Sequence, residues 1–340
     1  MNGEQSASAI SGSVDTNSLD MLKKRYLAIR SPKMKRVLKI QSEVMMIVRE
    51  FLRREGYLEI QPPIVGPVTD PGIRGAEQAT ISWYNGASYK IMSSMILYKQ
   101  MVIAALEKVY AFSPNVRLEP VEARRTGRHL SEFWQVDIER AFATCEDAMD
   151  LAERLLVYAI DQTKRRCGKE LDELGNRLEV PSIPFERITH KEAVEKARAL
   201  GLKVDNDSEI PWDAEKALSA SYNQPFWITD YPTPSRGFYY LEDPERPGLL
   251  RSMDLLYPDG FGEAISGGER EFRYDRVVKR IRDGGENPVQ YKWYLEMLKY
   301  GVPPSAGFGI GVERLTRFLC GLSKIWDATP FPKVPGVVSL

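Results

Sequence analysis

The sequence predicts an α+β fold in which an antiparallel β-sheet is flanked by helices. Short β-like runs bounded by turn-forming residues follow one another late in the chain, as FWITDY, GFYYL, SMDLLYP and FGEAIS. Amphipathic runs with helical spacing stand before, between and after the predicted strands. No internal repeat or linker interrupts residues 31–340, so these residues are expected to form one domain.

The N-terminal part is predicted to contain a disordered segment followed by a long helix. Residues 1–30 begin with the polar stretch MNGEQSASAISGSVDTNS, which has neither the basic start nor the apolar core of a secretory signal. The pair Ser31-Pro32 suits a helix N-cap and first turn, and Gly56 suits the C-terminal cap. The following YLEIQPPIV is expected to be a strand that two prolines interrupt.

The middle of the chain predicts a second helix, a hairpin and a third helix. Ser94 is expected to cap a helix that runs to about Tyr110. The runs AFSPNVRLE and EFWQVDIERAF then predict a long hairpin with a charged, mobile tip. Residues 145–167 have a strong helical pattern with Thr144 as the cap, whereas residues 168–225 show a mixed pattern.

The C-terminal part predicts two helices and a final segment that combines a strand with a helix. Helices are expected near residues 272–283 and 288–300. The segment AGFGIGVERLTRFLCGL is expected to begin as a glycine-spaced strand and to continue as a helix.

Composition restricts the class of protein. Lys+Arg and Asp+Glu both number 47, so any polyanion must be bound by a local cluster of cations. No apolar run reaches the roughly 18 residues that a membrane-spanning helix needs. The three cysteines, Cys145, Cys167 and Cys320, lack metal-ligand spacing. Reduced thiols in a cytoplasmic protein are therefore expected.

The segment RLEPVEARRTGRHLSEF, residues 117–133, concentrates arginine at the predicted hairpin tip. Arg117 offers a planar fork for phosphate oxygens, and Glu119 can orient it or accept from an exocyclic amine. Arg128 and His129 could meet a terminal phosphate, and Phe133 could stack on a base. The alternative is a solvated tip with surface ion pairs. The order of these residue types favours nucleotide binding.

The segment MDLLYPDGFGEAISGGERE, residues 253–271, predicts a cation site. Asp254 and Glu263 are expected on adjacent strands, with the Ser266 hydroxyl nearby. Magnesium usually takes one or two carboxylates together with substrate phosphates. Arg270 would point a positive charge into the same cavity. The alternative is an ordinary hairpin with a glycine bulge.

Arg314 and Lys99 are candidate ligand-binding residues only in combination with the other segments. The glycines of GFGIGVERL are a poor match to a dinucleotide fingerprint, and we expect them to thin a strand beneath a flat ligand, with Arg314 reaching that ligand. Lys99, on the second helix, is by itself most simply a solvated lysine.

Together these segments resemble the three motifs of class II aminoacyl-tRNA synthetases, in the aspartyl and asparaginyl branch. FLRREGYLEIQPPIV resembles motif 1, VRLE…GRHLSEFWQVDIE resembles motif 2, and GFGIGVERL resembles motif 3. The closing TPFPK is similar to the end of that branch's catalytic domain, so the resemblance covers about residues 31–333. Since motif 1 builds the dimer interface in that class, the resemblance implies a homodimer with two-fold symmetry.

The resemblance also implies ATP and Mg²⁺ as cofactors and an aminoacyl-adenylate intermediate. Arg117 would grip the α-phosphate, Glu119 would read the adenine amino group, and Phe133 would stack on the ring. The γ-phosphate end would be bound by Arg128, His129 and Arg314. Mg²⁺ would be held by Asp254, Glu263 and Ser266. The amino acid would be bound by Lys99, Asp137 and Arg270. Arg117, Arg270 and Arg314 would act in catalysis by stabilising the developing charge.

Departures from the family pattern shape the functional hypotheses. Residues 1–30 are too short for the OB-fold that reads the anticodon in this branch. Lys99, in LYKQ, matches the aspartyl pattern, in which the lysine contacts the substrate carboxylate. A core that activates aspartate without an anticodon reader is similar to asparagine synthetase A and its archaeal relatives.

The leading hypothesis is therefore that aspartate and ATP form an aspartyl-adenylate, which ammonia converts to asparagine with release of AMP. One alternative is a minimal asparaginyl- or aspartyl-tRNA synthetase, which would need tRNA as the acceptor. A second alternative is a non-catalytic paralogue that binds ATP.

Overall fold

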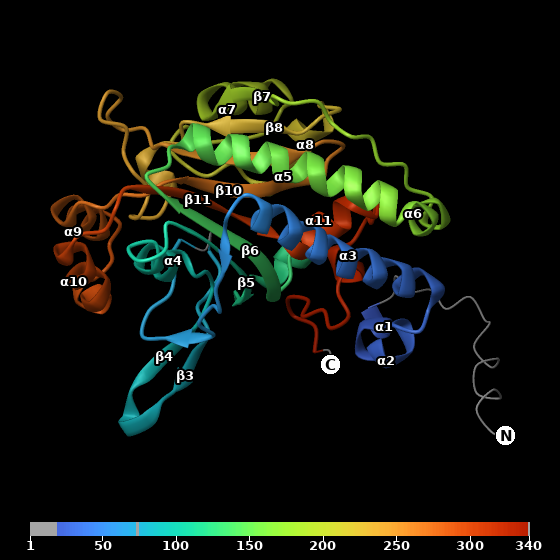
Figure 1. The fold of residues 1–340 in the computed structure, drawn as a ribbon, viewed down its shortest axis with the longest axis horizontal. Coiled ribbons are helices and arrows are strands. Elements are labelled where there is room, and N and C mark those ends of the chain that lie inside the picture. Colours follow the sequence, from blue (N-terminus) through green and yellow to red (C-terminus); the bar gives the residue numbers. More distant parts are fainter. Residues whose placement is uncertain (1–18, 73–74, 339–340) are drawn as a thin grey trace.

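An eight-stranded sheet organises the computed structural model, which describes residues 19–72 and 75–338. Figure 1 shows the sheet between layers of helices and loops. The strand order across the sheet is β1, β5, β6, β11, β10, β9, β8, β7. In that order the strands span Leu58–Glu59, Lys108–Val116, Glu132–Ala141, Ser305–Gly311, Gly262–Glu269, Ser252–Tyr257, Phe226–Thr229 and Glu186–Thr189.

The predicted α+β class is confirmed, and the sheet is antiparallel except at its edges. Strands β5, β6, β11, β10, β9 and β8 pair antiparallel in succession. The pairs β1–β5 and β7–β8 are parallel. Parallel pairing requires a crossover connection. For β7–β8 the crossover contains α7 (His190–Ala199) and α8 (Trp212–Ala220), which lie in the segment whose pattern was mixed.

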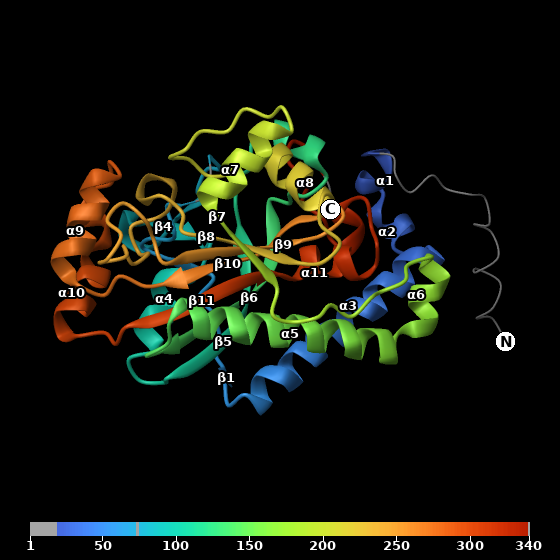
Figure 2. The same cartoon turned by 90° about the horizontal axis from the view of Figure 1, so that it is seen from above.

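Two long helices cover one face of the sheet, as Figure 2 shows. Helix α3 (Pro32–Arg54) begins where Ser31 Oγ accepts a hydrogen bond from the Met34 N–H, and Gly56 follows it with a φ of 82°. Helix α5 (Cys145–Arg166) begins with a capping box between Thr144 and Asp147. Both predicted helices are confirmed, and their apolar faces share one core with β11 and α11 (Val312–Leu319).

Other helices close the ends of the sheet. Helices α9 (Tyr274–Asp283) and α10 (Lys292–Tyr300) share a second core with α4 (Ile96–Val102). Helices α7 and α8 enclose a third core beside β8. The short α6 (Gly168–Leu174) follows α5. A separate small sheet has the order β2 (Val65–Gly66), β4 (Ser88–Ile91), β3 (Thr80–Ser82) and projects from the body in Figure 1.

Two predicted elements differ from the structure. Helix α4 ends at Val102, and Tyr110 lies inside β5, because the chain turns between them and then enters the sheet. Ser94 Oγ nevertheless accepts a hydrogen bond from the Ile96 N–H, as a cap would. The run GFYYL forms no strand and contributes only an isolated bridge from Tyr240 to Arg270.

The predicted disorder of residues 1–30 is wrong for the part that the structure describes; residues 1–18 lie outside that part. Helices α1 (Leu19–Lys23) and α2 (Arg25–Ala28) precede α3. The Arg25 side chain is buried and donates to the carbonyls of Trp326 at 3.1 Å and Thr329 at 2.6 Å. These partners lie at the other end of the chain, so local composition could not reveal them.

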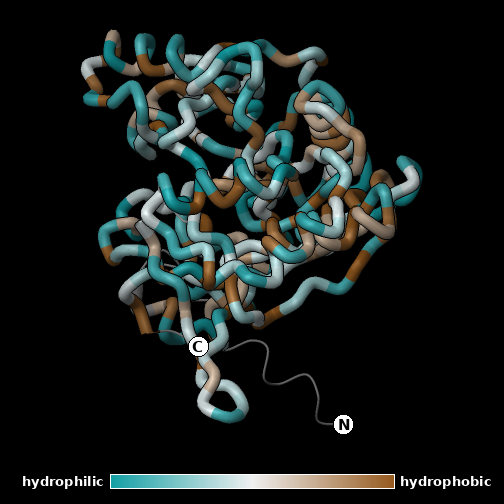
Figure 3. Tube along the Cα trace, turned by 90° about the vertical axis from the view of Figure 1, so that its left-hand side faces the viewer, coloured by the Kyte–Doolittle hydropathy of each residue, from teal (hydrophilic) through white to brown (hydrophobic). Residues whose placement is uncertain are grey.

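Figure 3 shows hydrophobic and hydrophilic residues interspersed along the chain. Within residues 19–72 and 75–338, no helix is both long and apolar enough to cross a membrane.

Candidate active site

A large pocket lies over the central strands β6, β11 and β10. Its volume of about 1290 Å³ is larger than a typical small-molecule pocket, so it can hold two substrates together. Apart from Asp254, all the residues that the sequence nominated line this pocket: Lys99, Arg117, Glu119, Arg128, His129, Phe133, Asp137, Glu263, Ser266, Arg270 and Arg314. The structure therefore brings together segments that are far apart in the sequence.

Glycines on β11 allow the floor of this pocket to form. A Cβ at Gly307 would lie 2.1 Å from Glu139 Oε2, so a side chain there would displace the Glu139 carboxylate. Gly309 pairs with Asp137 in the sheet and lines the pocket. The glycine-spaced strand thus leaves room for a buried acid below and a ligand above, in accord with the expectation of a thinned strand.

One end of the pocket contains four buried charged residues. Arg270 donates to Glu139 through Nε at 2.9 Å and Nη2 at 3.0 Å, and Lys99 Nζ lies 3.2 Å from Asp137 Oδ1. Burial by itself would raise the pKa of Glu139, but Arg270 and Lys99 outweigh burial and lower it. Glu139 was not nominated from the sequence; its only sequence signal was its place two residues after Asp137.

Two atoms of this cluster are buried without a hydrogen-bond partner. They are the donor Arg270 Nη1 and the acceptor Asp137 Oδ2. Buried polar groups are normally satisfied, so this donor and this acceptor mark where a ligand would bind. A donor for an oxygen and an acceptor for an ammonium suit an amino acid whose side chain carries a carboxyl or carboxamide oxygen.

Lys99 lines the pocket, and its own hydrogen bonds are made to the protein. Its ammonium donates to Asp137 Oδ1 and to the carbonyls of Ile138 at 3.2 Å and Phe308 at 3.4 Å. An ammonium has three protons, and these acceptors can engage all of them. Lys99 therefore fixes Asp137 and offsets negative charge beneath the pocket.

Arg117 and Phe133 lie together in another part of the pocket. The Arg117 guanidinium lies 5.3 Å from the centre of the Phe133 ring, and its Nε donates to the Ser93 carbonyl at 3.1 Å. Glu119 lines the same pocket. These three groups suit a purine nucleoside monophosphate: the arginine can bind the phosphate, the half-buried ring can stack on the base, and the carboxylate can accept from an amino group of the base.

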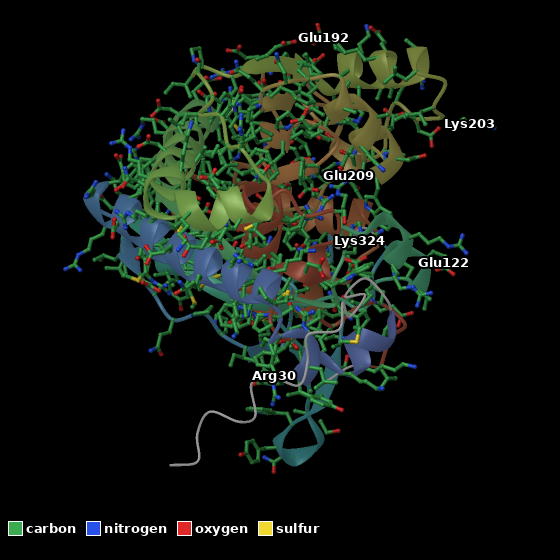
Figure 4. All side chains as sticks on the ribbon, turned by 90° about the vertical axis from the view of Figure 1, so that its right-hand side faces the viewer. Arg30, Glu122, Glu192, Lys203, Glu209 and Lys324 are labelled. Atoms are coloured by element: carbon green, nitrogen blue, oxygen red, sulfur yellow. The ribbon has the colours of Figure 1, made fainter. Side chains whose placement is uncertain are left out.

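The alternative of a solvated tip is wrong for Arg128 and His129, which are both buried. Helix α8 accounts for their burial. Glu215 Oε2 accepts from Arg128 Nη2 at 2.8 Å, and the Trp212 ring centre lies 4.2 Å from that of His129. The rest of the tip forms a short 3-10 helix, η2 (Val121–Thr126), from which Glu122 points outward in Figure 4.

Arg314 completes this end of the pocket. Its Nη1 lies 3.0 Å from Glu263 Oε1. Burial lowers the pKa of Arg128, and Glu215 opposes that effect. Glu215 and Trp212 could not be identified from the sequence, because nothing in PWDAEKAL beyond a helix start indicates which residues the helix will contact.

An arginine engages two of the three groups that were predicted to hold magnesium. Both oxygens of Asp254 accept from the guanidinium of Arg236, at 3.1 and 2.5 Å, and Ser266 Oγ accepts from the same group at 2.9 Å. Glu263 instead pairs with Arg314. In the part of the chain that the structure describes, no three His, Cys, Asp or Glu side chains are grouped to hold a metal ion. The donor set at Asp254 and Ser266 therefore does not fit Mg²⁺.

The sheet, its flanking helices and the position of the pocket define a class II synthetase catalytic fold, as the comparisons with known proteins bear out. Residues 18–335 match the family model described as tRNA synthetases class II (D, K and N). The chain belongs to this family, and the resemblance inferred from the three motifs is confirmed.

Several relatives are aminoacyl-tRNA ligases. The asparagine–tRNA ligase of Pyrococcus abyssi is 37% identical over 318 residues, which cover 93% of this chain and 72% of the relative. The aspartate–tRNA(Asp/Asn) ligase of Methanocaldococcus jannaschii is 36% identical over 314 residues, covering 92% and 70%. The asparaginyl-tRNA synthetase from Pyrococcus horikoshii complexed with asparaginyl-adenylate superposes with a TM-score of 0.87 at 33% identity, covering 94% and 73%. These relatives support the tRNA-ligase alternative better than the leading hypothesis of an ammonia ligase.

Proposed function

We propose that this protein uses ATP to activate asparagine or aspartate as an aminoacyl-adenylate and then transfers the acyl group to tRNA. The observation that carries the proposal is the unsatisfied pair formed by Arg270 Nη1 and Asp137 Oδ2. Both residues line the pocket that also contains Arg117 and Phe133. The tRNA-ligase relatives support the choice of acceptor.

The proposed chemistry begins with amino-acid binding. Asp137 Oδ2 accepts from the α-ammonium, and Arg270 Nη1 donates to the side-chain oxygen. The α-carboxylate then attacks the α-phosphorus of ATP, a new C–O–P link forms, and the bond to the β-phosphate breaks. Pyrophosphate leaves with the electron pair of that bond.

The chain's own cations stabilise the charge of this step. Arg117 would meet the α-phosphate, while Arg128, His129 and Arg314 would hold the departing end. Fixed cations in a partly buried pocket stabilise developing charge without reorganising. Holding both reactants together removes much of the entropic barrier.

A second candidate function is the aspartate–ammonia ligase reaction. Lys99 lines the pocket beside Arg270 and favours it, because a second cation suits a substrate carboxylate better than a carboxamide, even though Asp137 and Glu139 pair with these two cations. In this reaction the side-chain (β) carboxylate of aspartate, rather than the α-carboxylate, would be activated; ammonia would attack the β-acyl carbon of the adenylate, and AMP would leave.

Pyrophosphate exchange into ATP tests the activation step that both candidates share. We expect exchange with aspartate or asparagine and none with glutamate or lysine. Asp137→Asn should raise the KM for the amino acid by about 100-fold, because the amide no longer offers a charged acceptor. Absence of exchange with both amino acids would overturn the proposed activation.

We further propose that two copies of the chain associate. Leu58 and Ile64, in the segment that resembles motif 1, are 54% and 64% exposed. Strand β1, which contains Leu58, is an edge of the large sheet. An exposed apolar side chain at a sheet edge, with a second one six residues later in the chain, suits a self-complementary interface.

A further inference from the structure

Arg236 lies in the wall of the pocket and pairs with two carboxylates. Besides its two bonds to Asp254 and one to Ser266, its Nε lies 2.8 Å from Glu209 Oε1. Glu209, labelled in Figure 4, belongs to the segment that leads into α8. The guanidinium also lies 3.7 Å from the centre of the Tyr231 ring.

Arg236 separates Asp254 from the pocket. Arg236 and Ser266 line the cavity, whereas Asp254, which is 1% exposed, does not. The Tyr231 hydroxyl donates to Asp254 Oδ2 at 2.9 Å on the buried side. The Asp254 carboxylate thus accepts from Tyr231 on its buried side and from Arg236 on the pocket side, which leaves no position on the pocket side for a metal ion.

We propose that Arg236 is a resident cation that takes the place of a divalent metal ion at Asp254 and Ser266. Its guanidinium engages both oxygens of Asp254 in the two-pronged geometry that arginine forms with carboxylates. The protein itself then binds no divalent cation at these residues, and any Mg²⁺ enters the pocket only as the complex of the triphosphate.

Electrostatics maintain this arrangement. A metal ion could reach Asp254 only by displacing a buried, paired guanidinium, which would leave Glu209 without that partner and put two cations side by side. Burial lowers the pKa of Arg236, but Asp254 and Glu209 outweigh burial and hold it well above its ordinary value. The positive charge is therefore permanent and does not vary with the concentration of free Mg²⁺.

Manganese binding to the nucleotide-free protein tests the proposal. Electron paramagnetic resonance measures how much Mn²⁺ each protein binds. The wild type should have no Mn²⁺ site that depends on Asp254, so Asp254→Asn should bind as much Mn²⁺ as the wild type. Arg236→Met, which frees Asp254 and Ser266, should gain one Mn²⁺ site per chain. The double variant Arg236→Met/Asp254→Asn should lose that site again.

Arg246→Met provides a matched control. Arg246 also pairs with two carboxylates, those of Asp230 and Asp243, but its side chain is 50% exposed. This variant should gain no site. Because the assay contains neither ATP nor an amino acid, its outcome is independent of the proposed function.

Two results would overturn the proposal. One is a wild-type Mn²⁺ site that Asp254→Asn abolishes. The other is a folded Arg236→Met variant that binds no more Mn²⁺ than the wild type. If Arg236→Met does not fold, the comparison of wild type with Asp254→Asn still tests the proposal, because a wild-type Mn²⁺ site that depends on Asp254 contradicts a resident arginine.

Discussion

Arg270 and Glu139 show how single residues define the amino-acid end of the pocket. Their side chains are 1% and 0% exposed, and they meet through two parallel hydrogen bonds. Glu139 accepts from Nε and Nη2 of Arg270, which leaves Nη1 buried without a hydrogen-bond partner. Arg270 could be nominated from the sequence because it follows the glycines of SGGERE. Glu139 could not, since its role depends on a strand that returns across the sheet.

Arg270→Lys should reduce kcat/KM for the amino acid by about 100-fold and leave the KM for ATP nearly unchanged. Lysine keeps the positive charge, but its ammonium cannot form a bidentate pair with Glu139 and also donate to a substrate oxygen. Pyrophosphate exchange at varied amino-acid and ATP concentrations measures both constants. Arg246→Lys is the surface control. A uniform loss in both substrates would contradict a specific role at the amino-acid end.

Glu313 should make stability depend on pH. Burial raises its pKa from 4.5 to about 7, although the Trp134 N–H donates to its carboxylate. The folded state thus holds a proton that the unfolded state releases, so this contribution to stability is present below pH 4.5 and is lost as the pH rises through about 7. The size of the loss is on the order of 3 kcal/mol.

In the wild type, the free energy of unfolding should therefore fall between pH 5 and pH 8. In Glu313→Gln this fall should be smaller, because glutamine does not titrate. Urea unfolding at a series of pH values measures both profiles. The variant should be more stable than the wild type at the upper end of that range. Parallel profiles for the two proteins would show that Glu313 is not the group responsible.

At the scale of elements, helix α8 fixes the phosphate end of the pocket. Trp212 and Glu215 stand three positions apart, so both project from one side of the helix. They contact His129 and Arg128, which are consecutive in the chain. One helix from the crossover between β7 and β8 thereby holds two adjacent residues of the loop after β5, Arg128 and His129.

Glu215→Gln should raise the KM for ATP by about 10-fold without changing the KM for the amino acid, because Arg128 loses its charged partner but remains buried. Glu215 acts through Arg128, so it is a positioning residue. Exposed Glu195 on α7 provides the control variant Glu195→Gln. Equal effects on both substrates, or none, would contradict this role.

Elements with strong local signals could be predicted from the sequence. Helices α3 and α5 have caps at Ser31 and Thr144 and long amphipathic faces, and the hairpin of β5 and β6 alternates clearly. The end of α4 was misplaced because the apolar spacing continues from helix to strand without a break. Helices α7 and α8 could not be read from the mixed pattern, although they determine the burial of Arg128.

At the scale of the whole molecule, distant segments converge on one pocket. Predicted site residues from α4, β6, β10 and α11 meet there. What the sequence could not indicate is which charges neutralise one another. Arg236, remote from every motif, engages two of the three predicted metal ligands. Such pairings depend on the register of β9 and β10, which is a property of the assembled sheet.

Leu58→Asp with Ile64→Asp should raise the dissociation constant of the proposed dimer by at least about 100-fold, because two charges would be buried at the edge of the sheet. Sedimentation equilibrium measures this constant. Val289→Asp, at a site on η4 (Pro288–Tyr291) that is 75% exposed, is the control. A monomeric wild-type protein would contradict the proposed interface.

Product analysis of the purified protein distinguishes tRNA from ammonia as the acceptor. The protein would be incubated with ATP, Mg²⁺, ammonium and labelled aspartate or asparagine, with and without total tRNA. We expect acid-precipitable label and AMP release that depend on tRNA. Free asparagine and AMP formed from aspartate without tRNA would contradict tRNA as the acceptor and establish the ammonia-ligase reaction in its place.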